Sequence, residues 1–464
     1  MEQNNSYDFE DLSDGLKERA EKFLSDRFSE LYFDVDELEI LVDHYIAQRR
    51  DSDAFALLEY GLKLHPNSSE LLVKKAKLLL LQGDIGKASV LLDTLSVDDY
   101  EVTMLKMEAL VKLNRLSEAV ELAENLLKNE EDTEMCSTCL DISSIFIEQD
   151  HYDLALSYLK VGKQYCSNNI ELLSELAFCL EKVGDVDKAI DVYNDIIDID
   201  PYYADAWFNL AQVFLGQNRY RQALHAYEMC LTIDDSDSLV WLQKGHAHFS
   251  LDEFHEAIEC YEHCLKDTKD NWQLYLFLAE CYDKLGDCDM AIRYNRKVLE
   301  AQPSNYDALI ALGCCLMEKK QLDEAQDLLS AAVKLRPQAS EAWFNMGEVL
   351  NFKNQPADAV SYYMRAIELD PKNIDAMIAL ATTYIDEDKP SEALPVLLRV
   401  KAMEPETPRL YLLLAVVYYG LNDSENLLDC LGKMVTSGTE DINIFLNVCP
   451  ELSEVVKNYI ERKK

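Results

Sequence analysis

Apolar residues recur along most of this chain at steps of three and four, the spacing of one face of a helix. Two such runs lie between 343 and 366: Trp343, Met346, Gly347 and Leu350, then Ala359, Tyr363 and Ala366. Between the runs stands Asn354, and asparagine, like glycine, tolerates the left-handed backbone that ends a helix. The pattern predicts two amphipathic helices joined by a tight turn.

The same pattern returns every 34 residues, since Trp343 follows Trp207 by 136 residues, four times 34. One column holds small residues: Ala155, Ala189, Ala223, Ala257, Ala291, Ala325, Ala359 and Ala393. The turn column holds Gly83, Asp150, Gly184, Asn218, Asp252, Gly286, Asn354, Asp388 and Asn422, with Arg49 and Lys320 as exceptions. A single hairpin of this length cannot offset its conformational entropy, so we expect neighbouring hairpins to stack.

These marks resemble the tetratricopeptide repeat family, whose period is about 34 residues and whose motif has aromatic, small and proline places. The signature places are filled in one repeat by Trp207, Leu210, Ala211, Phe214, Ala223, Tyr227 and Cys230, and Pro371 closes the repeat that contains Trp343. The resemblance implies an all-α fold, a right-handed superhelix (solenoid) of about twelve tandem helical hairpins.

We expect four segments along the chain: a capping helix within 1–34, three repeats over 35–135, nine regular repeats over 136–441, and a second capping helix within 442–464. The third repeat is irregular, because Ala88 and Ala119 are 31 residues apart and Ala119 and Ala155 are 36 apart. Either a hinge or a longer loop would explain this spacing. The terminal helices, one of them expected after Pro450, are most simply caps on the ends of the stack, and docking segments for a partner are the alternative.

The chain has 86 acidic and 44 basic residues among 464, a formal charge of −42. This charge would repel nucleic acid and favours a partner with positive charge. The sequence has no signal-peptide pattern and no long apolar run, so neither secretion nor membrane insertion is expected. Thirteen scattered cysteines, an odd number, suit a reducing cytoplasm better than a disulfide framework.

Candidate chemistry is sparse. His246, His248, His255 and His263 fall in one repeat (238–271), which leaves a metal site as an alternative function, although a solvated helix face explains them as well. Cys136 and Cys139 form one CxxC with no second pair at zinc-finger spacing. The nucleophile-elbow, dinucleotide and phosphate-loop motifs are missing, so we expect neither catalysis nor a cofactor.

The resemblance implies a concave groove lined by the first helix of each repeat. Counted from the start of each repeat, the second position of this helix is mostly acidic, with Asp36, Glu70, Glu171, Asp205, Asp307, Glu341 and Asp375. Its fifth place is apolar, with Phe208, Leu242, Leu276, Ile310, Phe344, Ile378 and Leu412. The ninth place holds Gln212, His246, Glu280, Cys314 and Glu348, and Asn209 and Asn345 stand at the sixth place, where O-GlcNAc transferases carry an asparagine ladder.

These columns predict a protein-interaction scaffold or adaptor that binds a basic and apolar peptide in a groove with acidic borders. Purely structural roles could produce the same columns without a ligand. First-turn acids also satisfy the exposed N–H groups of a helix, and fifth-place residues could pack between repeats. A regulatory or chaperone-like subunit that holds a folded partner on its convex face is a functional alternative.

Overall fold

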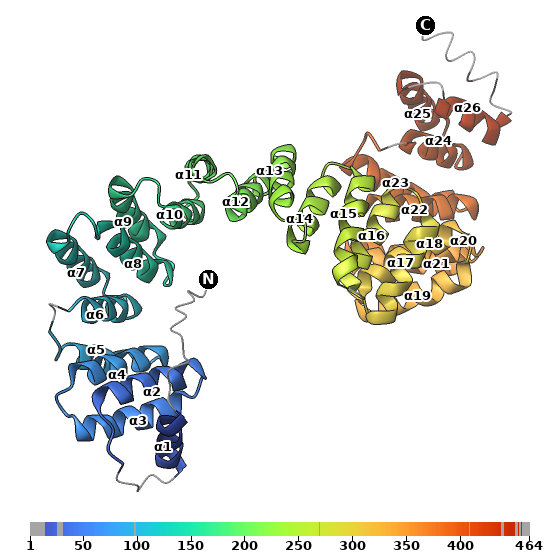
Figure 1. The fold of residues 1–464 in the computed structure, drawn as a ribbon. Helices are drawn as coiled ribbons and strands as arrows, with labels where there is room; N and C mark the ends of the chain where they lie inside the picture. The colour runs from blue at the N-terminus through green and yellow to red at the C-terminus, as the bar shows by residue number, and fades with distance from the viewer. Residues whose placement is uncertain are drawn as a thin grey trace. The chain divides into compact units, whose positions relative to one another are not determined.

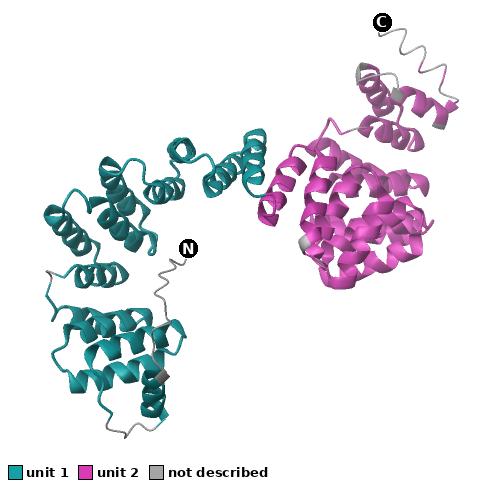
Figure 2. Cartoon of the chain, in the orientation of Figure 1, with its two compact units in different colours: residues 1–234 teal, residues 235–464 magenta. Residues whose placement is uncertain are grey.

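The computed structural model describes residues 14–25, 31–96, 99–268, 270–407, 409–437 and 440–450, together with 453 and 456. These residues form helices joined by short turns, and no strand occurs in the ranges given (Figure 1). The chain divides into two compact units, unit 1 over 1–234 and unit 2 over 235–464 (Figure 2). The all-α prediction is confirmed.

In unit 1 the short helix α1 precedes six hairpins, each made of a first and a second helix. The bounds are α1 (Asp14–Ser25), α2 (Val35–Ala47), α3 (Asp51–Leu64), α4 (Ser69–Leu81), α5 (Ile85–Leu92), α6 (Tyr100–Lys112), α7 (Leu116–Asn129), α8 (Met135–Ile147), α9 (Tyr152–Tyr165), α10 (Ile170–Lys182), α11 (Val186–Ile199), α12 (Ala204–Gly216) and α13 (Tyr220–Ile233).

Unit 2 continues the pattern with six hairpins and a final helix. The bounds are α14 (Ser238–Phe249), α15 (Phe254–Asp267), α16 (Trp272–Lys284), α17 (Cys288–Ala301), α18 (Tyr306–Glu318), α19 (Leu322–Leu335), α20 (Ser340–Phe352), α21 (Pro356–Leu369), α22 (Ile374–Asp386), α23 (Pro390–Met403), α24 (Leu410–Gly420), α25 (Ser424–Ser437) and α26 (Glu440–Val448).

The turn column is a column of positive φ angles, as its composition predicts. Asn218, Asn354 and Asp388 have φ of 58°, 61° and 56°, and Gly184 has φ of 84°. The exceptions obey the same geometry, because Arg49 and Lys320 adopt φ of 57° and 61°. The repeat therefore imposes the left-handed turn even where the side chain disfavours it.

Small residues let the two helices of a hairpin approach each other. Every alanine of the small column is fully buried, as at Ala223 and Ala359. On the facing helix Gly347 has no room for a side chain, since a Cβ there would lie 2.6 Å from Cε1 of Tyr363. The hairpins of unit 2 that include α18 to α21 share one apolar core around Leu316 and Met346.

Tryptophan at the fourth position of a repeat forms a hydrogen bond to the loop that precedes it. The indole Nε1 of Trp207 donates to the carbonyl oxygen of Pro201 at 3.0 Å. Trp241 and Trp343 donate in the same way to Asp235 at 2.8 Å and to Pro337 at 2.9 Å. In each case the acceptor is six residues upstream, so the first helix is tied to the loop that leads into it.

The irregular spacing near residue 100 comes from a shortened second helix. Helix α5 has 8 residues, whereas α3 and α7 have 14 each. Lys106, only 9% exposed, packs beside this segment, and its Nζ donates to the carbonyl oxygen of Leu95 at 3.2 Å. A buried lysine thus joins α6 to the loop that follows the short helix.

The first hairpin is covered by α1, which buries Leu16, Ala20 and Phe23 in the same core as Leu38 and Leu57. At the other end α26 contributes Ile442 and Phe445 to a core shared with α24 and α25. Residues 1–13 of the predicted N-terminal capping segment and most of the segment after Pro450 lie outside the described residues. Among the described helices, none is long and apolar enough to cross a membrane.

Candidate functional site

A trough runs along the first helices of unit 1. Its main part is a cavity of about 850 Å³ between α8, α10 and α12. The residues that line it are Ser137, Leu140, Asp141, Ser144, Glu148, Ile170, Glu171, Ser174, Glu175, Tyr203, Asp205 and Asn209. Because the 34-residue period repeats the orientation of each first helix, the same places of three successive repeats face this cavity.

The lining of this cavity is acidic. It includes five carboxylates, on Asp141, Glu148, Glu171, Glu175 and Asp205, and no lysine or arginine. Glu175 is half-buried, and burial, followed by the negative charge of Glu171, raises its pKa above the usual carboxyl value. Such a cavity attracts cationic groups and disfavours anions.

A second cavity of about 480 Å³ extends the trough toward α4 and α6 and shares Asp141, Ser144 and Glu148 with the first. Here the charges are mixed, because Lys112 Nζ pairs with Glu108 Oε1 at 2.5 Å and Lys77 also lines the wall. We call the two cavities together the unit 1 trough.

One hydrogen bond orients a carboxylate where the two cavities meet. The hydroxyl of Tyr100, on α6, donates to Asp141 Oδ2, on α8, at 2.6 Å. Desolvation and this bond raise the pKa of Tyr100 above its ordinary value, so the phenol stays protonated at neutral pH. The Asp141 carboxylate is thereby held on a wall of the trough.

The predicted groove residues do not all reach this trough. Glu171, Asp205 and Asn209 line it, and the other predicted residues lie elsewhere on the first helices. Exposed to solvent are Asp205, Glu280, Asp307, Glu341 and Asp375. Half-buried are Phe208, Asn209, Gln212, Leu242, His246, Leu276, Phe344, Glu348 and Ile378, while Ile310 and Asn345 are 7% and 8% exposed.

Several fifth- and ninth-place residues have contacts within the fold. The ring of Phe208 packs 6.2 Å from that of Tyr227, and the ring of Phe344 packs 6.1 Å from that of Tyr363. Leu242, Leu276 and Ile378 are partly buried, the first beside a core of unit 2 that includes Tyr261. Part of the apolar column therefore packs against the second helices of the hairpins.

At the ninth place the side chains meet tyrosines of the second helix. His246 Nδ1 lies 2.9 Å from the hydroxyl of Tyr261, and its ring packs against Phe277 at 4.7 Å. Burial lowers the pKa of His246. Although Glu280 is an exposed residue, partial desolvation of its carboxyl raises its pKa, and the positive charge of Lys284 acts in the opposite direction. These groups are parts of the hairpin as well as of the first-helix surface.

Three carboxylates of the trough escaped the sequence prediction: Asp141, Glu148 and Glu175. Asp141 and Glu175 stand at the sixth place, the same place as Asn209, in the two preceding repeats. Extending that column toward the N-terminus would have found them. Glu148 stands at the thirteenth place, near the end of α8, and none of the predicted groove columns contains it.

The histidines of the 238–271 repeat do not converge. His248 Nδ1 lies 2.8 Å from Glu253 Oε2, and the ring of His263 stacks on Trp241 at 4.2 Å. His255 is exposed on α15. Across the described ranges no group of three or more His, Cys, Asp or Glu side chains is placed to hold a metal ion.

The cysteines differ from expectation in one respect. Cys136 forms a disulfide with Cys166, 30 residues away, and not with Cys139 of the CxxC. The other eleven cysteines are free thiols, most of them buried. The bond joins the first turn of α8 to the residue that follows α9, so it closes the open end of that hairpin.

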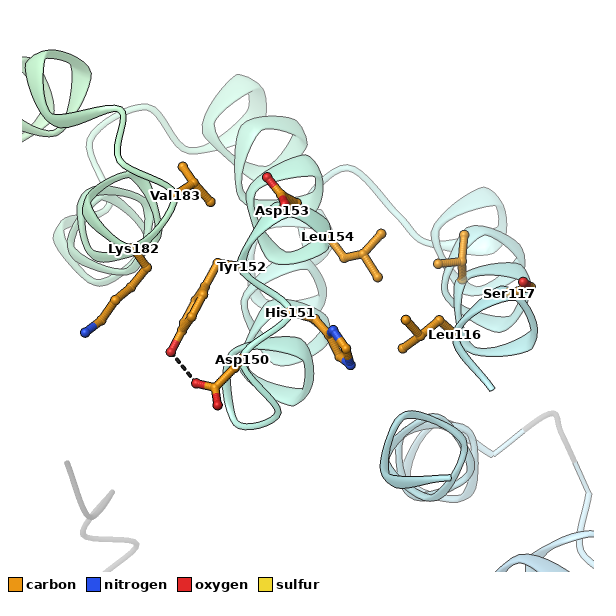
Figure 3. Close-up of a pocket in the computed structure, with 10 residues that line it drawn as sticks. Leu116, Ser117, Asp150, His151, Tyr152, Asp153, Leu154, Lys182 and Val183 are labelled. Atoms are coloured by element: carbon orange, nitrogen blue, oxygen red, sulfur yellow. Dashed lines mark hydrogen bonds between the residues drawn. The ribbon is translucent and has the colours of Figure 1, made fainter. Parts of the chain in front are cut away.

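A separate cavity of about 840 Å³ lies on another face of unit 1, where turns and second helices meet. Leu116, Leu154 and Val183 form its apolar wall, and Asp150, His151 and Lys182 its polar wall (Figure 3). Tyr152 donates a hydrogen bond to Asp150 at its edge. The chemistry of this lining is mixed, in contrast to the acidic trough.

Comparison with known families places repeats along much of the chain. The model described as the Cilia and flagella-associated protein 70 C-terminal domain matches residues 232–426, and the model described as Tetratricopeptide repeat matches residues 169–236.

Curated relatives match over short segments. Protein O-mannosyl-transferase TMTC1 of Mus musculus is 25% identical over 139 residues, 29% of this chain and 14% of its own length. Uncharacterized protein MJ0572 of Methanocaldococcus jannaschii is 41% identical over 44 residues, 10% of this chain and 51% of its own. The chain thus spans about one seventh of the first relative and about half of the second.

Solved structures share helical-repeat segments with the chain. YrrB, described as a TPR protein with an unusual peptide-binding site, is 24% identical, with a TM-score of 0.36, over 40% of this chain and 96% of its own. A tetratricopeptide repeat protein from Parabacteroides merdae is 14% identical, with a TM-score of 0.44, over 56% and 97%. The C-terminal part of a TPR repeat-containing protein from Cytophaga hutchinsonii is 14% identical, with a TM-score of 0.46, over 52% and 99%.

Proposed function

Because this chain is a tetratricopeptide repeat protein, we propose that it is a non-catalytic scaffold or adaptor that binds a basic, partly apolar segment of a partner protein in the unit 1 trough. The observation that carries the proposal is the cavity between α8, α10 and α12, whose lining includes five carboxylates and no cation. The protein works in the cytoplasm, as its acidic composition and its eleven free thiols favour.

Electrostatics selects the partner. Carboxylates that line a concave surface reinforce one another, because its walls exclude part of the solvent that would screen them. A lysine- or arginine-rich segment relieves the repulsion between neighbours such as Glu171 and Glu175. A nucleic acid or an acidic segment would increase it, so both are rejected as partners.

Apolar contacts add affinity that salt does not screen. Leu140 and Ile170 are half-buried in the wall of the trough, and Tyr203 offers an aromatic face beside Asp205. A partner segment with leucine- or valine-like residues between its basic residues would bury these groups. The trough crosses five first helices, α4, α6, α8, α10 and α12, which suits an extended segment better than a compact one.

Unit 2 offers a second stretch of the same kind. Asp307, Glu341 and Asp375 are exposed at the second place of successive first helices, with half-buried Phe344 and Ile378 at the fifth place. We assign these residues to a weaker acidic surface for the same class of partner.

The experiment compares two triple variants of the full chain. Glu171→Lys, Glu175→Lys and Asp205→Lys together reverse the charge of the trough. Asp187→Lys, Asp191→Lys and Asp195→Lys make the same charge change at exposed positions on α11, a second helix. The probe is a fluorescein-labelled peptide of alternating lysine and leucine, measured by anisotropy at two salt concentrations.

The trough variant should bind the probe about tenfold more weakly at low salt, since exposed charge contacts contribute modestly and three are reversed. Its affinity should also depend less on salt. The α11 variant should bind nearly as the parent does. Equal losses in both variants would show a non-specific charge effect and would overturn the proposal.

The folded-partner alternative is favoured by one observation, the cavity of about 840 Å³ beside α7, α9 and α10. Substituting Leu116 and Leu154 with Asp would disrupt a partner surface there and leave the trough untouched. Loss of a natural partner from native lysate with this variant, and its retention with the trough variant, would assign the binding to that face.

A further inference from the structure

We propose that the Cys136–Cys166 disulfide is a redox switch for the unit 1 trough. In the oxidised state the bond holds one wall of the trough in its binding position, and a dithiol reductant breaks the bond and loosens that wall. The inference rests on the proposed function, because it concerns the regulation of the same site. It begins from the position of the bond at one end of the trough.

The helix that carries Cys136 also forms one wall of the trough. Helix α8 contributes Ser137, Leu140, Asp141, Ser144 and Glu148 to the lining, and Cys136 immediately precedes the first of them. Any displacement of the first turn of α8 therefore moves Ser137 directly, and Leu140 and Asp141 follow in the next turn.

The first turn of α8 has no side-chain cap. Its N-cap residue, Glu134, makes no side-chain capping hydrogen bond, unlike Asn169 at the start of α10, whose side chain accepts from the backbone N–H of Leu172. A helix start without such a cap frays more readily. Two hydrogen bonds of this turn run to the segment between α7 and α8: the Met135 N–H donates to the carbonyl oxygen of Glu131, and Thr138 Oγ1 donates to Glu130 Oε2, each at 3.1 Å.

The disulfide adds an attachment to the second helix. It joins α8 to Cys166, the C-cap residue of α9, across Cα atoms 6.0 Å apart. One turn further into the hairpin, Gly162 packs so closely that a Cβ there would lie 3.0 Å from Cβ of Cys139. Packing thus fixes the hairpin from Cys139 inward, and the sulfur–sulfur bond is a covalent link at its open end.

The disulfide is accessible to a reductant, and the neighbouring thiol of Cys139 does not exchange with it. Cys136 and Cys166 are both half-exposed, so a reductant can reach them. Cys139, one turn away, is fully buried, and burial raises the pKa of its thiol to about 11. Little Cys139 thiolate exists at neutral pH, so the disulfide does not reshuffle onto the CxxC.

Opening the switch is a two-electron reduction. A dithiol attacks the bond as a thiolate, the sulfur–sulfur bond breaks, and the second thiol of the reductant displaces the mixed disulfide. The reductant leaves as its own disulfide, and Cys136 and Cys166 each take one proton. In a reducing compartment such half-exposed bonds are usually transient and regulatory.

The test uses the full chain in air-oxidised and dithiothreitol-reduced forms with the labelled lysine–leucine peptide. We expect reduction to weaken binding by about threefold to tenfold, because one wall of the trough loses its fixed position. The double variant Cys136→Ser, Cys166→Ser should bind like the reduced parent in both conditions. Cys288→Ser, which removes a half-exposed free thiol on α17, should keep the full response.

Two further measurements separate this inference from the proposed function. Thiol titration of the denatured oxidised chain should find 11 reactive thiols, and 13 after reduction. Hydrogen exchange should show faster exchange over residues 135–141 in the reduced form. Thirteen thiols before reduction, or equal affinity in both forms, would overturn the switch alone. If the oxidised parent fails to bind the peptide, the proposed function fails, and the exchange rates still decide whether the bond controls α8.

Discussion

The hydroxyl of Tyr363 donates a hydrogen bond to Glu348 Oε1 at 2.5 Å, joining the second helix α21 to the first helix α20 of one hairpin. The equivalent tyrosine of another repeat, Tyr227, is equally buried, but its hydroxyl has no hydrogen-bond partner among the described residues. The two tyrosines fill the same place of the repeat, so they form a matched pair with opposite hydrogen-bonding states.

We expect Tyr363→Phe to lower the free energy of unfolding by about 1 to 2 kcal/mol, because it removes a hydrogen bond to a charged acceptor. Tyr227→Phe should be neutral or stabilising by about 1 kcal/mol, since it removes a buried hydroxyl without a partner. Urea midpoints of the two variants, measured side by side, check the difference. A larger loss for Tyr227→Phe would contradict the hydrogen-bond assignment.

Lys320 occupies the left-handed turn between α18 and α19 with φ of 61°. Lys320→Gly should raise the free energy of unfolding by about 1 kcal/mol, because glycine adopts positive φ without the Cβ clash. The reverse change, Gly184→Ala at φ of 84°, should lower it by a similar amount. Thermal or urea denaturation of both variants tests the sign, and a destabilised Lys320→Gly would show that the lysine side chain matters more than the backbone.

Protonation of Glu175 should make both the stability of the chain and its affinity for a basic peptide depend on pH. Its pKa is raised by burial and by Glu171, so the folded state holds this proton more tightly than the unfolded state does. The contribution of protonated Glu175 to the free energy of unfolding is complete below the pKa that Glu175 has in the unfolded chain. It is lost as the pH rises through the pKa that Glu175 has in the folded chain. At pH 7 the folded chain therefore carries a carboxylate that destabilises it.

Glu175→Gln should accordingly raise the urea midpoint at pH 7, and the gain should vanish near pH 4, where the parent is protonated as well. The same variant should bind the lysine–leucine peptide about twofold to fivefold more weakly at pH 7. For the parent, affinity should fall on acidification, and the fall should begin above the ordinary carboxyl range because the pKa of Glu175 is raised. A variant that gains stability without losing affinity would place Glu175 outside the binding surface.

Lys106 is buried and joins α6 to the loop that follows the short helix α5. Lys106→Ala should lower the free energy of unfolding by about 2 kcal/mol, because it removes packed methylenes and the hydrogen bond to Leu95. Lys106→Met keeps the packing and loses only the bond, so it should cost about half as much. Urea denaturation compares the two; equal costs would show that packing has no part in the effect.

Much of the fold follows from local chemistry that a sequence displays. The periods of three and four locate the helices, and Asn218 or Gly184 mark turns because few other residues tolerate positive φ. Lys320 shows the limit of this reasoning. Packing of the two helices imposes the same positive-φ turn there, although lysine gives no sequence signal for such a turn. The short α5 is also visible only as a spacing error, since nothing between Leu92 and Asp99 signals where the helix stops.

The candidate site was predicted less completely because it depends on contacts across repeats. Asp205 and Asn209 line the trough as their columns suggest, whereas most of the other predicted residues lie elsewhere on the first helices. Tyr100 and Asp141 are 41 residues apart and meet only after the hairpins stack. The Cys136–Cys166 bond likewise joins residues that no local motif pairs, and the odd, scattered set of cysteines favoured reduced thiols.

The tryptophan bonds to carbonyls six residues upstream have an evolutionary consequence. Because donor and acceptor both travel within one 34-residue block, such a block can be duplicated or deleted in the gene without orphaning either group. Adding such a block to the array therefore leaves this hydrogen bond intact. The trough positions, such as Glu171 and Asp205, can then vary to suit a partner, while Trp207 keeps its hydrogen bond to the preceding loop.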